Sequence, residues 1–240
     1  MRGIFASWLL AALSCTSAQA LTLTQVEVEA GAEKIYRERV EEARSRYELD
    51  ADAAFLERVT IIARKLIAQA GREYGIAVSA WEMHTTSSAD ENASSMAGGK
   101  LLIGQAYVQR LQLTDDELAM LIAHEIAHVV LQHNLKEMRE ALRLEPGREQ
   151  QPFADLEYAI DHDQALMRKL ADFDREQEFE ADREGMLLAA HAGWPPARLA
   201  NYFKKLVRND PSANADRFEH PAPARRWRAA QVLARELGSS

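Results

Sequence analysis

The sequence predicts one mostly helical α+β domain with a small sheet. Several segments carry apolar residues at helical spacing, two short segments have the pattern of strands, and a Gly-Gly turn signal precedes the second of them. The chain has 240 residues, enough for a sizeable core. It contains no internal repeat and no linker that would separate two domains.

Composition excludes several classes of protein. Hydrophobic residues make up 47% and charged residues 28% of the chain, close to globular averages, which excludes a disordered or collagen-like chain. Lys and Arg total 29 against 37 Asp and Glu, for a formal charge of −8, which argues against a nucleic-acid binder. A single cysteine excludes a disulfide scaffold.

The N-terminal part predicts two helices. Residues 24–50 are rich in Glu, Arg and Ala and predict an exposed helix that lies as an arm over the main domain. Residues 52–70 predict a better patterned helix that ends at Gly71 and Gly75. Its apolar face is formed by Phe55, Val59, Ile62 and Leu66.

A strand-rich stretch follows. We expect a strand within 77–86, a polar loop over 87–95 and a turn at Gly98-Gly99. A second strand then consists of Lys100, Leu101, Leu102 and Ile103.

The remaining elements are predicted as helices. Thr114 and Glu117 form a capping box, in which each side chain bonds the other residue's backbone N–H, and the apolar helix that follows is expected to be buried. Residues 135–175 are polar, with a breaker at Pro146-Gly147. The other helices are expected at 105–111, 155–170, 176–190, 196–208 and 224–237.

The first 20 residues have the pattern of a secretory signal peptide. A basic start and a short apolar run lead to a small-x-small ending, which predicts cleavage after Ala20. The alternative is a lipoprotein signal with Cys15 as the lipidated residue, which would attach the protein to a membrane. No later stretch is apolar enough to span a bilayer. We therefore expect an exported protein of a bacterial periplasm, with a helical arm over 21–50 and the main domain over 51–240.

One short motif indicates a metal site. His124, Glu125 and His128 form an H-E-x-x-H pattern within the capped helix. Residues four apart share a helix face, so both imidazoles can bind one zinc ion. Glu125 can reach a water on that ion and take its proton. The alternative, histidines satisfied inside a core, would bury polar groups on an apolar helix without a use.

A catalytic zinc site needs a third protein ligand and leaves one position open. Glu178 and Asp182 are four residues apart and share a helix face, so one can bind the metal while the other orients a ligand histidine. Glu180 points about 200° away from Glu178 at 100° per residue. The alternative is an exposed acidic helix start.

Together these residues resemble metallopeptidase family 48. The Glu-x-x-x-Asp pattern of Glu178 and Asp182 begins 50 residues after His128, as that family's helix does. The resemblance implies a zincin-like fold with one zinc per chain, bound by His124, His128 and Glu178. It assigns Asp182 to hold a ligand and Glu125 to act as general base. The competing candidate for the third ligand is the adjacent Glu180.

Two further segments extend the resemblance. Residues 92–101 are similar to the family's N-A-x-x-x-P-G-G stretch, which leads into the edge strand beside the zinc, and Ala97 replaces the usual Pro. Residues 220–226 are similar to its H-P-x-x-x-x-R element, which implies that His220 faces the metal and Arg226 helps hold it. Either side chain near the zinc could stabilise an oxyanion; the alternative for His220 is a plain His-Pro turn before a helix. His133 is expected to pack or cap.

These features predict a zinc endopeptidase. An extended peptide would add as a strand along Lys100, Leu101, Leu102 and Ile103, an edge strand bordering the active site. The family resemblance implies misfolded or misassembled envelope proteins as substrates.

Three alternatives remain. The chain could be a chaperone-like or binding module that keeps the zinc fold with little hydrolysis. A purely structural zinc would need a fourth protein ligand. An aminopeptidase is a further enzymatic variant.

Overall fold

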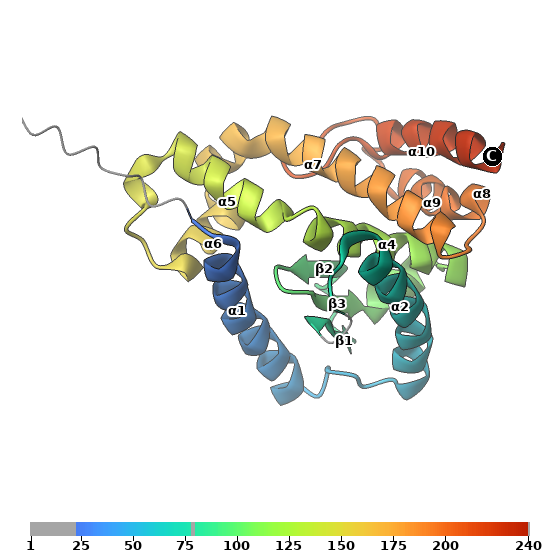
Figure 1. The fold of residues 1–240 in the computed structure, drawn as a ribbon, viewed down its shortest axis with the longest axis horizontal. Coiled ribbons are helices and arrows are strands. Elements are labelled where there is room, and N and C mark those ends of the chain that lie inside the picture. Colours follow the sequence, from blue (N-terminus) through green and yellow to red (C-terminus); the bar gives the residue numbers. More distant parts are fainter. Residues whose placement is uncertain (1–22, 78–79, 240) are drawn as a thin grey trace, which may run out of the picture.

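The computed structural model describes residues 23–77 and 80–239; the predicted signal peptide and Cys15 lie outside them. Within this part, helices surround one small sheet (Figure 1), so the predicted mostly helical α+β fold is confirmed. The helices are α1 (Gln25–Ser45), α2 (Ala53–Tyr74), α3 (Gln105–Arg110), α4 (Asp115–Val130), α5 (His133–Leu144), the 3₁₀ turn η2 (Pro146–Arg148), α6 (Phe153–His162), α7 (Gln164–His191), α8 (Pro196–Leu199), α9 (Asn201–Asn209) and α10 (Pro223–Gly238).

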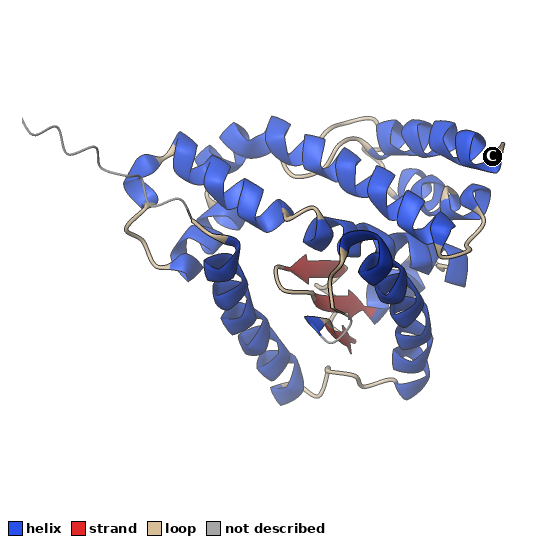
Figure 2. Cartoon of the chain, in the orientation of Figure 1, coloured by secondary structure: helices blue, strands red, loops and turns tan. Residues whose placement is uncertain are grey.

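The sheet has three strands in the order β1-β3-β2 among the described residues. β1 (Glu82–Thr86) runs parallel to β3 (Lys100–Gly104), and β2 (Ala93–Met96) runs antiparallel to β3. Figure 2 shows the strands between helices rather than on an open face. The loop predicted over 87–95 is therefore wrong at its end, where β2 begins.

The predicted position of the second strand in the sheet is also wrong. Lys100, Leu101, Leu102 and Ile103 lie in the central strand, paired on both sides, and not at an edge. Both faces of β3 are also covered, because Leu101 and Ile103 pack into one hydrophobic cluster and Leu102 into another. A substrate strand cannot add to β3. The two outer strands are β1 and β2, and β2 is the one that packs against α4.

A glycine turn joins β2 and β3. Gly98 and Gly99 both have positive φ, 80° and 78°, a conformation that side chains with a Cβ rarely adopt. Met96 pairs with Lys100 across this turn. The turn predicted at Gly98-Gly99 is thus confirmed, with Ala97 directly before it.

Helix α1 is not the exposed arm that its composition predicts. One face of α1 is buried, and the Tyr36 hydroxyl donates to the carbonyl oxygen of Leu101 at 2.9 Å. Charged residues on the other face dominate the composition and conceal the small and aromatic residues of the buried face. These buried residues are Val28, Ala32, Tyr36, Val40 and Ala43.

The packing of α4 against α7 positions the site. α4 is buried around nearly its whole circumference and packs against α7. The helix predicted over 155–170 breaks at Asp163, and its second half continues without interruption into the helix predicted over 176–190 to form α7. α7 crosses both hydrophobic clusters: Leu166 and Leu170 lie in one, Met186 and Leu188 in the other. The buried polar residues of α7, among them Glu178 and Asp182, lie between these two apolar parts of the helix. No helix among the described residues is long and apolar enough to cross a bilayer.

Candidate metal centre

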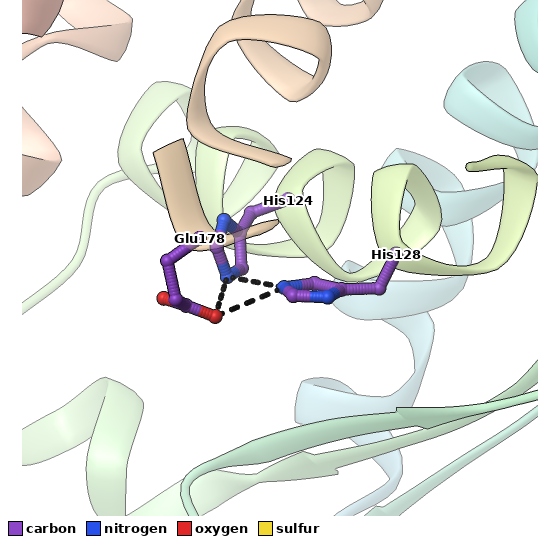
Figure 3. A group of neighbouring side chains, drawn as sticks. All are labelled: His124, His128 and Glu178. Carbon is purple, nitrogen blue, oxygen red and sulfur yellow. Dashed lines mark hydrogen bonds and ion pairs between the residues drawn. The ribbon is translucent and has the colours of Figure 1, made fainter. Parts of the chain in front are cut away.

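Two imidazole nitrogens of α4 and one carboxylate oxygen of α7 converge where the two helices meet (Figure 3). His128 Nε2 lies 3.1 Å from His124 Nε2 and 3.1 Å from Glu178 Oε1, and His124 Nε2 lies 3.6 Å from that oxygen. Ligand atoms around a tetrahedral zinc with bonds of about 2.0–2.1 Å lie roughly 3.3–3.4 Å apart. The three atoms therefore have the spacing and the chemistry of three zinc ligands.

Helix α4 presents its two histidines from a firmly anchored position. The Thr114–Glu117 capping box is formed as predicted, and Lys205 from α9 adds an ion pair to Glu117 at 2.6 Å. His124 and the residues around it are buried, while His128 is one-fifth exposed at its side chain. A buried, capped helix keeps the imidazoles in fixed rotamers, as a metal site requires.

Glu178, not Glu180, joins the two histidines. The Glu178 side chain is 7% exposed and faces α4, whereas that of Glu180 is 57% exposed and lies against His133 and Lys136. The helical phase predicted from the 178/182 spacing therefore holds. α7 continues without a break across this segment, which allows the simple 100° rule to work.

Asp182 and Arg226 support the histidine–glutamate group from behind. Asp182 Oδ1 lies 3.0 Å from His124 Nδ1, so the carboxylate favours a proton on Nδ1. Once the proton on Nε2 is lost, the lone pair of that nitrogen faces the site. The Arg226 guanidinium donates to both oxygens of Asp182, at 2.8 and 2.6 Å, and lies 3.1 Å from Glu178 Oε2. Arg226 thus holds the two carboxylates rather than an ion.

These contacts keep both carboxylates ionised although they are buried. Burial alone would raise the pKa of Glu178, but Arg226 and His124 outweigh it, so its pKa lies well below the ordinary value. The pKa of Asp182 is lowered in the same way, against burial, by Arg226 and by the hydrogen bond with His124. Metal ligation requires deprotonated carboxylates, which this arrangement provides.

His133 holds the second histidine, a role that the sequence did not suggest. Its Nδ1 lies 2.9 Å from His128 Nδ1, and its Nε2 lies 3.2 Å from Glu180 Oε2. Because a carboxylate only accepts, His133 donates from Nε2 and accepts at Nδ1 from His128. Burial is the largest of the causes that lower the pKa of His133 to about 3, so this imidazole is neutral. His128 therefore directs the lone pair of Nε2 toward the site.

The position of His133 could not be found from helix periodicity. α4 ends at Val130, and Gln132 has φ +57°, so the chain changes direction before α5 begins at His133. The rotation of 100° per residue counted from His124 therefore does not predict where the side chain of His133 points. The one available signal was the repeated occurrence of histidine soon after the motif.

Glu125 and His220 complete the surroundings of the three atoms. Glu125 lies between the histidines and the sheet, where its Oε2 accepts a hydrogen bond from Ser95 Oγ of β2 at 2.9 Å. His220, on the segment before α10, has its side chain half exposed and places Nδ1 3.0 Å from Glu178 Oε2. Both side chains line the cleft beside the three atoms.

The cleft consists of two cavities that meet at this group. One, of about 330 Å³, extends along α3 and α9 and is lined by Tyr107, Leu121 and Tyr202. The other, of about 240 Å³, extends along α5 and the N-terminal half of α7. Both are bordered by Ala93 of β2, so the exposed strand edge runs past the group.

Two imidazoles of an H-E-x-x-H helix and one glutamate of a second helix meet here. These three groups are the metal ligands typical of a zinc metallopeptidase. The chain belongs to peptidase family M48, whose sequence profile matches residues 57–235.

Several characterised proteins are similar to this chain. The metalloprotease LoiP of Escherichia coli (strain K12) is 33% identical over 143 residues, which cover 57% of this chain and 56% of LoiP. The beta-barrel assembly-enhancing protease of Yersinia pestis is 28% identical over 162 residues, which cover 61% of this chain and 33% of that protein. The mitochondrial metalloendopeptidase OMA1 of Arabidopsis thaliana is 29% identical over 150 residues, covering 61% and 30%. The matched region thus spans about half of LoiP and a third of the other two.

Proposed function

We propose that this chain is a zinc-dependent endopeptidase that hydrolyses peptide bonds in proteins of the cell envelope. The observation that carries the proposal is the triangle of His124 Nε2, His128 Nε2 and Glu178 Oε1, with sides of 3.1 to 3.6 Å and Glu125 beside it. Three protein ligands leave a coordination position for chemistry, in contrast to a closed structural site.

Each residue has a role in this proposal. When bound, zinc polarises a peptide carbonyl and activates water as a nucleophile. Glu125 takes the proton of the attacking water and delivers it to the leaving amine. His220, half exposed and adjacent to Glu178, is the residue available to donate a hydrogen bond to the developing oxyanion. Arg226 acts through Asp182 and Glu178, which it holds in place.

The substrate backbone is proposed to pair with β2. This strand has a partner on one side only within the described residues, and its Ala93, Ser94 and Ser95 border the cleft. Addition of an extended peptide to a sheet edge gives affinity through main-chain hydrogen bonds, with little dependence on sequence. Such recognition suits unfolded segments of many proteins.

The cellular setting is part of the proposal. The N-terminal signal pattern supports export to a periplasm, with lipidation of Cys15 as the alternative. One similar protein is named for enhancing β-barrel assembly, and such barrels belong to outer membranes, which supports misfolded or misassembled envelope proteins as substrates.

Digestion of unfolded casein tests the activity. We expect the zinc-loaded protein to cleave casein and its Glu125→Gln variant to be at least about 100-fold slower with equal zinc content. Glu176→Gln, a matched change at an exposed position of α7, should leave the rate unchanged. Equal rates for the wild type and Glu125→Gln would contradict the proposal. Casein binding without cleavage by the wild type would favour the chaperone-like alternative.

A further inference from the structure

The smaller of the two cavities is strongly acidic. Glu137 of α5, Asp174 of α7 and Glu219 of the segment before α10 all line it, beside Ser94 and Ser95 of β2. We refer to it as the acidic cavity. The larger cavity across the metal group is lined instead by apolar and aromatic side chains together with arginines. The cleft therefore differs in character on its two sides.

Asp174 is buried without a partner. Its residue is 9% exposed, and its Oδ1 is fully buried without a hydrogen bond. The side-chain nitrogen of Gln177, one turn further along α7 and also lining the acidic cavity, lacks a hydrogen bond as well. Buried polar atoms are normally satisfied, so the unpaired Asp174 oxygen, an acceptor, indicates a missing donor at this cavity wall. The Gln177 nitrogen is itself a donor, so it needs an acceptor and not a cation.

Within the part of the chain that the structure describes, no Lys or Arg side chain pairs with the carboxylates of this wall. In residues 23–77 and 80–239, none of Glu137, Asp174 and Glu219 forms an ion pair with Lys or Arg. Arg175 is next to Asp174 in the chain, but its guanidinium donates to the carbonyl oxygen of Arg217 at 2.9 Å and to Asp172.

The acids therefore destabilise one another. Burial, with the neighbouring carboxylates of Glu219 and Glu178, raises the pKa of Asp174 to about 7. Burial and then Asp174 raise the pKa of Glu137. A positive charge placed among these groups would relieve the repulsion.

We propose that the acidic cavity is a subsite that binds a lysine or arginine side chain of the substrate polypeptide, next to the bond that is cleaved. The inference rests on the proposed peptidase function, and it adds a charge preference to a backbone-based recognition. A peptide lying on β2 would pass the mouth of this cavity, so its side chain can enter while the backbone stays paired with the strand. The long stem of Lys or Arg can reach Asp174 with its charged end.

A second metal ion is a poorer fit. The three carboxylates do not converge on one point: among the described residues, the metal-type cluster is His124, His128 and Glu178. Divalent ions need several oxygens at one short distance, which the three carboxylates do not provide. A flexible cationic side chain, in contrast, can be shared by acids that are spread along a wall.

Binding to a non-cleaving variant tests the inference independently of turnover. The probes are unstructured ten-residue peptides that differ at one position, which carries Lys, Met or Glu and is moved along the sequence. Their affinities for the zinc-loaded Glu125→Gln protein are measured by fluorescence anisotropy. At one position we expect Lys to bind roughly five- to tenfold more tightly than Met, and Glu to bind most weakly.

Variants in the Glu125→Gln background then assign the effect. Glu137→Lys should invert the preference so that Glu binds more tightly than Lys, while Asp174→Asn and Glu219→Gln should each reduce it. Glu176→Lys, with the same change of charge at an exposed position of α7, should leave the preference unchanged.

Several results would overturn the inference. They are equal affinities at every position, an equal effect of Glu176→Lys, failure of every peptide to bind, and displacement of the Lys peptide by millimolar Ca²⁺ or Mg²⁺. Failure of the wild type to cleave casein would instead refute the proposed function, because a binding preference does not depend on turnover.

Discussion

The backbones of Gly185 on α7 and His124 on α4 are in direct contact. A Cβ atom at position 185 would lie 2.8 Å from the backbone nitrogen of His124 and 2.9 Å from the carbonyl of Ala123. Only glycine permits this approach. The close contact lies two turns from Glu178 along α7, and it sets the distance at which the glutamate meets the imidazoles.

Substitution of Gly185 by Ala should therefore affect metal binding as well as stability. The added Cβ forces two backbones apart, and we expect a loss of about 1–3 kcal/mol in the free energy of unfolding. Zinc affinity should fall because Glu178 moves away from the histidines. Thermal unfolding and a zinc titration measure both. In the control Gly147→Ala, the new Cβ meets nothing within 4 Å, and both quantities should stay unchanged. An unchanged zinc affinity in Gly185→Ala would contradict the proposed role of the contact.

Replacement of Arg226 by Met should strongly destabilise the protein. The change leaves Asp182 and Glu178 buried without their guanidinium partner, which costs about 3–5 kcal/mol. Arg225→Met is a matched control, since that side chain is half exposed and pairs with Asp216 at the surface, a contact worth about 1 kcal/mol or less. Chemical denaturation of both variants gives the comparison. Similar losses of unfolding free energy in the two variants would contradict a larger contribution of the buried ion pairs.

Removal of the His133 imidazole should weaken zinc binding through His128. Loss of a partner that orients a ligand histidine typically reduces metal affinity about 10- to 100-fold, and we expect a decrease in this range for His133→Phe. His133→Gln offers an oxygen that can accept from His128 Nδ1 and should lose less. Competition with a zinc-binding dye measures the affinities. Wild-type affinity in His133→Phe would contradict the assigned contact.

Zinc binding should release close to one proton. Burial alone would lower the pKa of His124, but Glu178 and Asp182 outweigh it and raise the pKa to about 10 in the protein without bound metal. At pH 7.5 this histidine is therefore protonated, and it must lose a proton before Nε2 can bind zinc. Because the pKa is raised, zinc affinity should increase about tenfold per pH unit up to pH 9. Calorimetry in buffers of different ionisation enthalpy counts the protons. Zero release, or an affinity independent of pH, would disagree with this prediction.

Local patterns predicted the elements and the helical phase well. The spacing of His124 and His128 and the continuity of α7 around Glu178 are properties of single helices, so a fixed rotation per residue was sufficient. The sheet was different, because strand order depends on pairing between distant segments. Nothing in Lys100–Gly104 itself distinguishes a central strand from an edge strand, and β2 has the polar composition of a loop.

Contacts between side chains of different helices and loops could also not be predicted from the sequence. The support of His128 by His133 depends on a chain reversal at Gln132, and the wall of the acidic cavity combines α5, α7 and the segment before α10. Such groupings follow from tertiary packing, which overrides any single-element rule. Gly185 is a further case, since a glycine within a helix is understood only once its neighbour is known.

Zinc content is the most direct test of the central claim that two histidines of α4 and Glu178 of α7 form one metal site. The wild type, Glu178→Ala and Glu180→Ala are purified in the presence of zinc, passed through gel filtration and analysed by atomic absorption. We predict one zinc per chain in the wild type and in Glu180→Ala, and none retained in Glu178→Ala. Retention of zinc by Glu178→Ala, or its loss only in Glu180→Ala, would contradict the account.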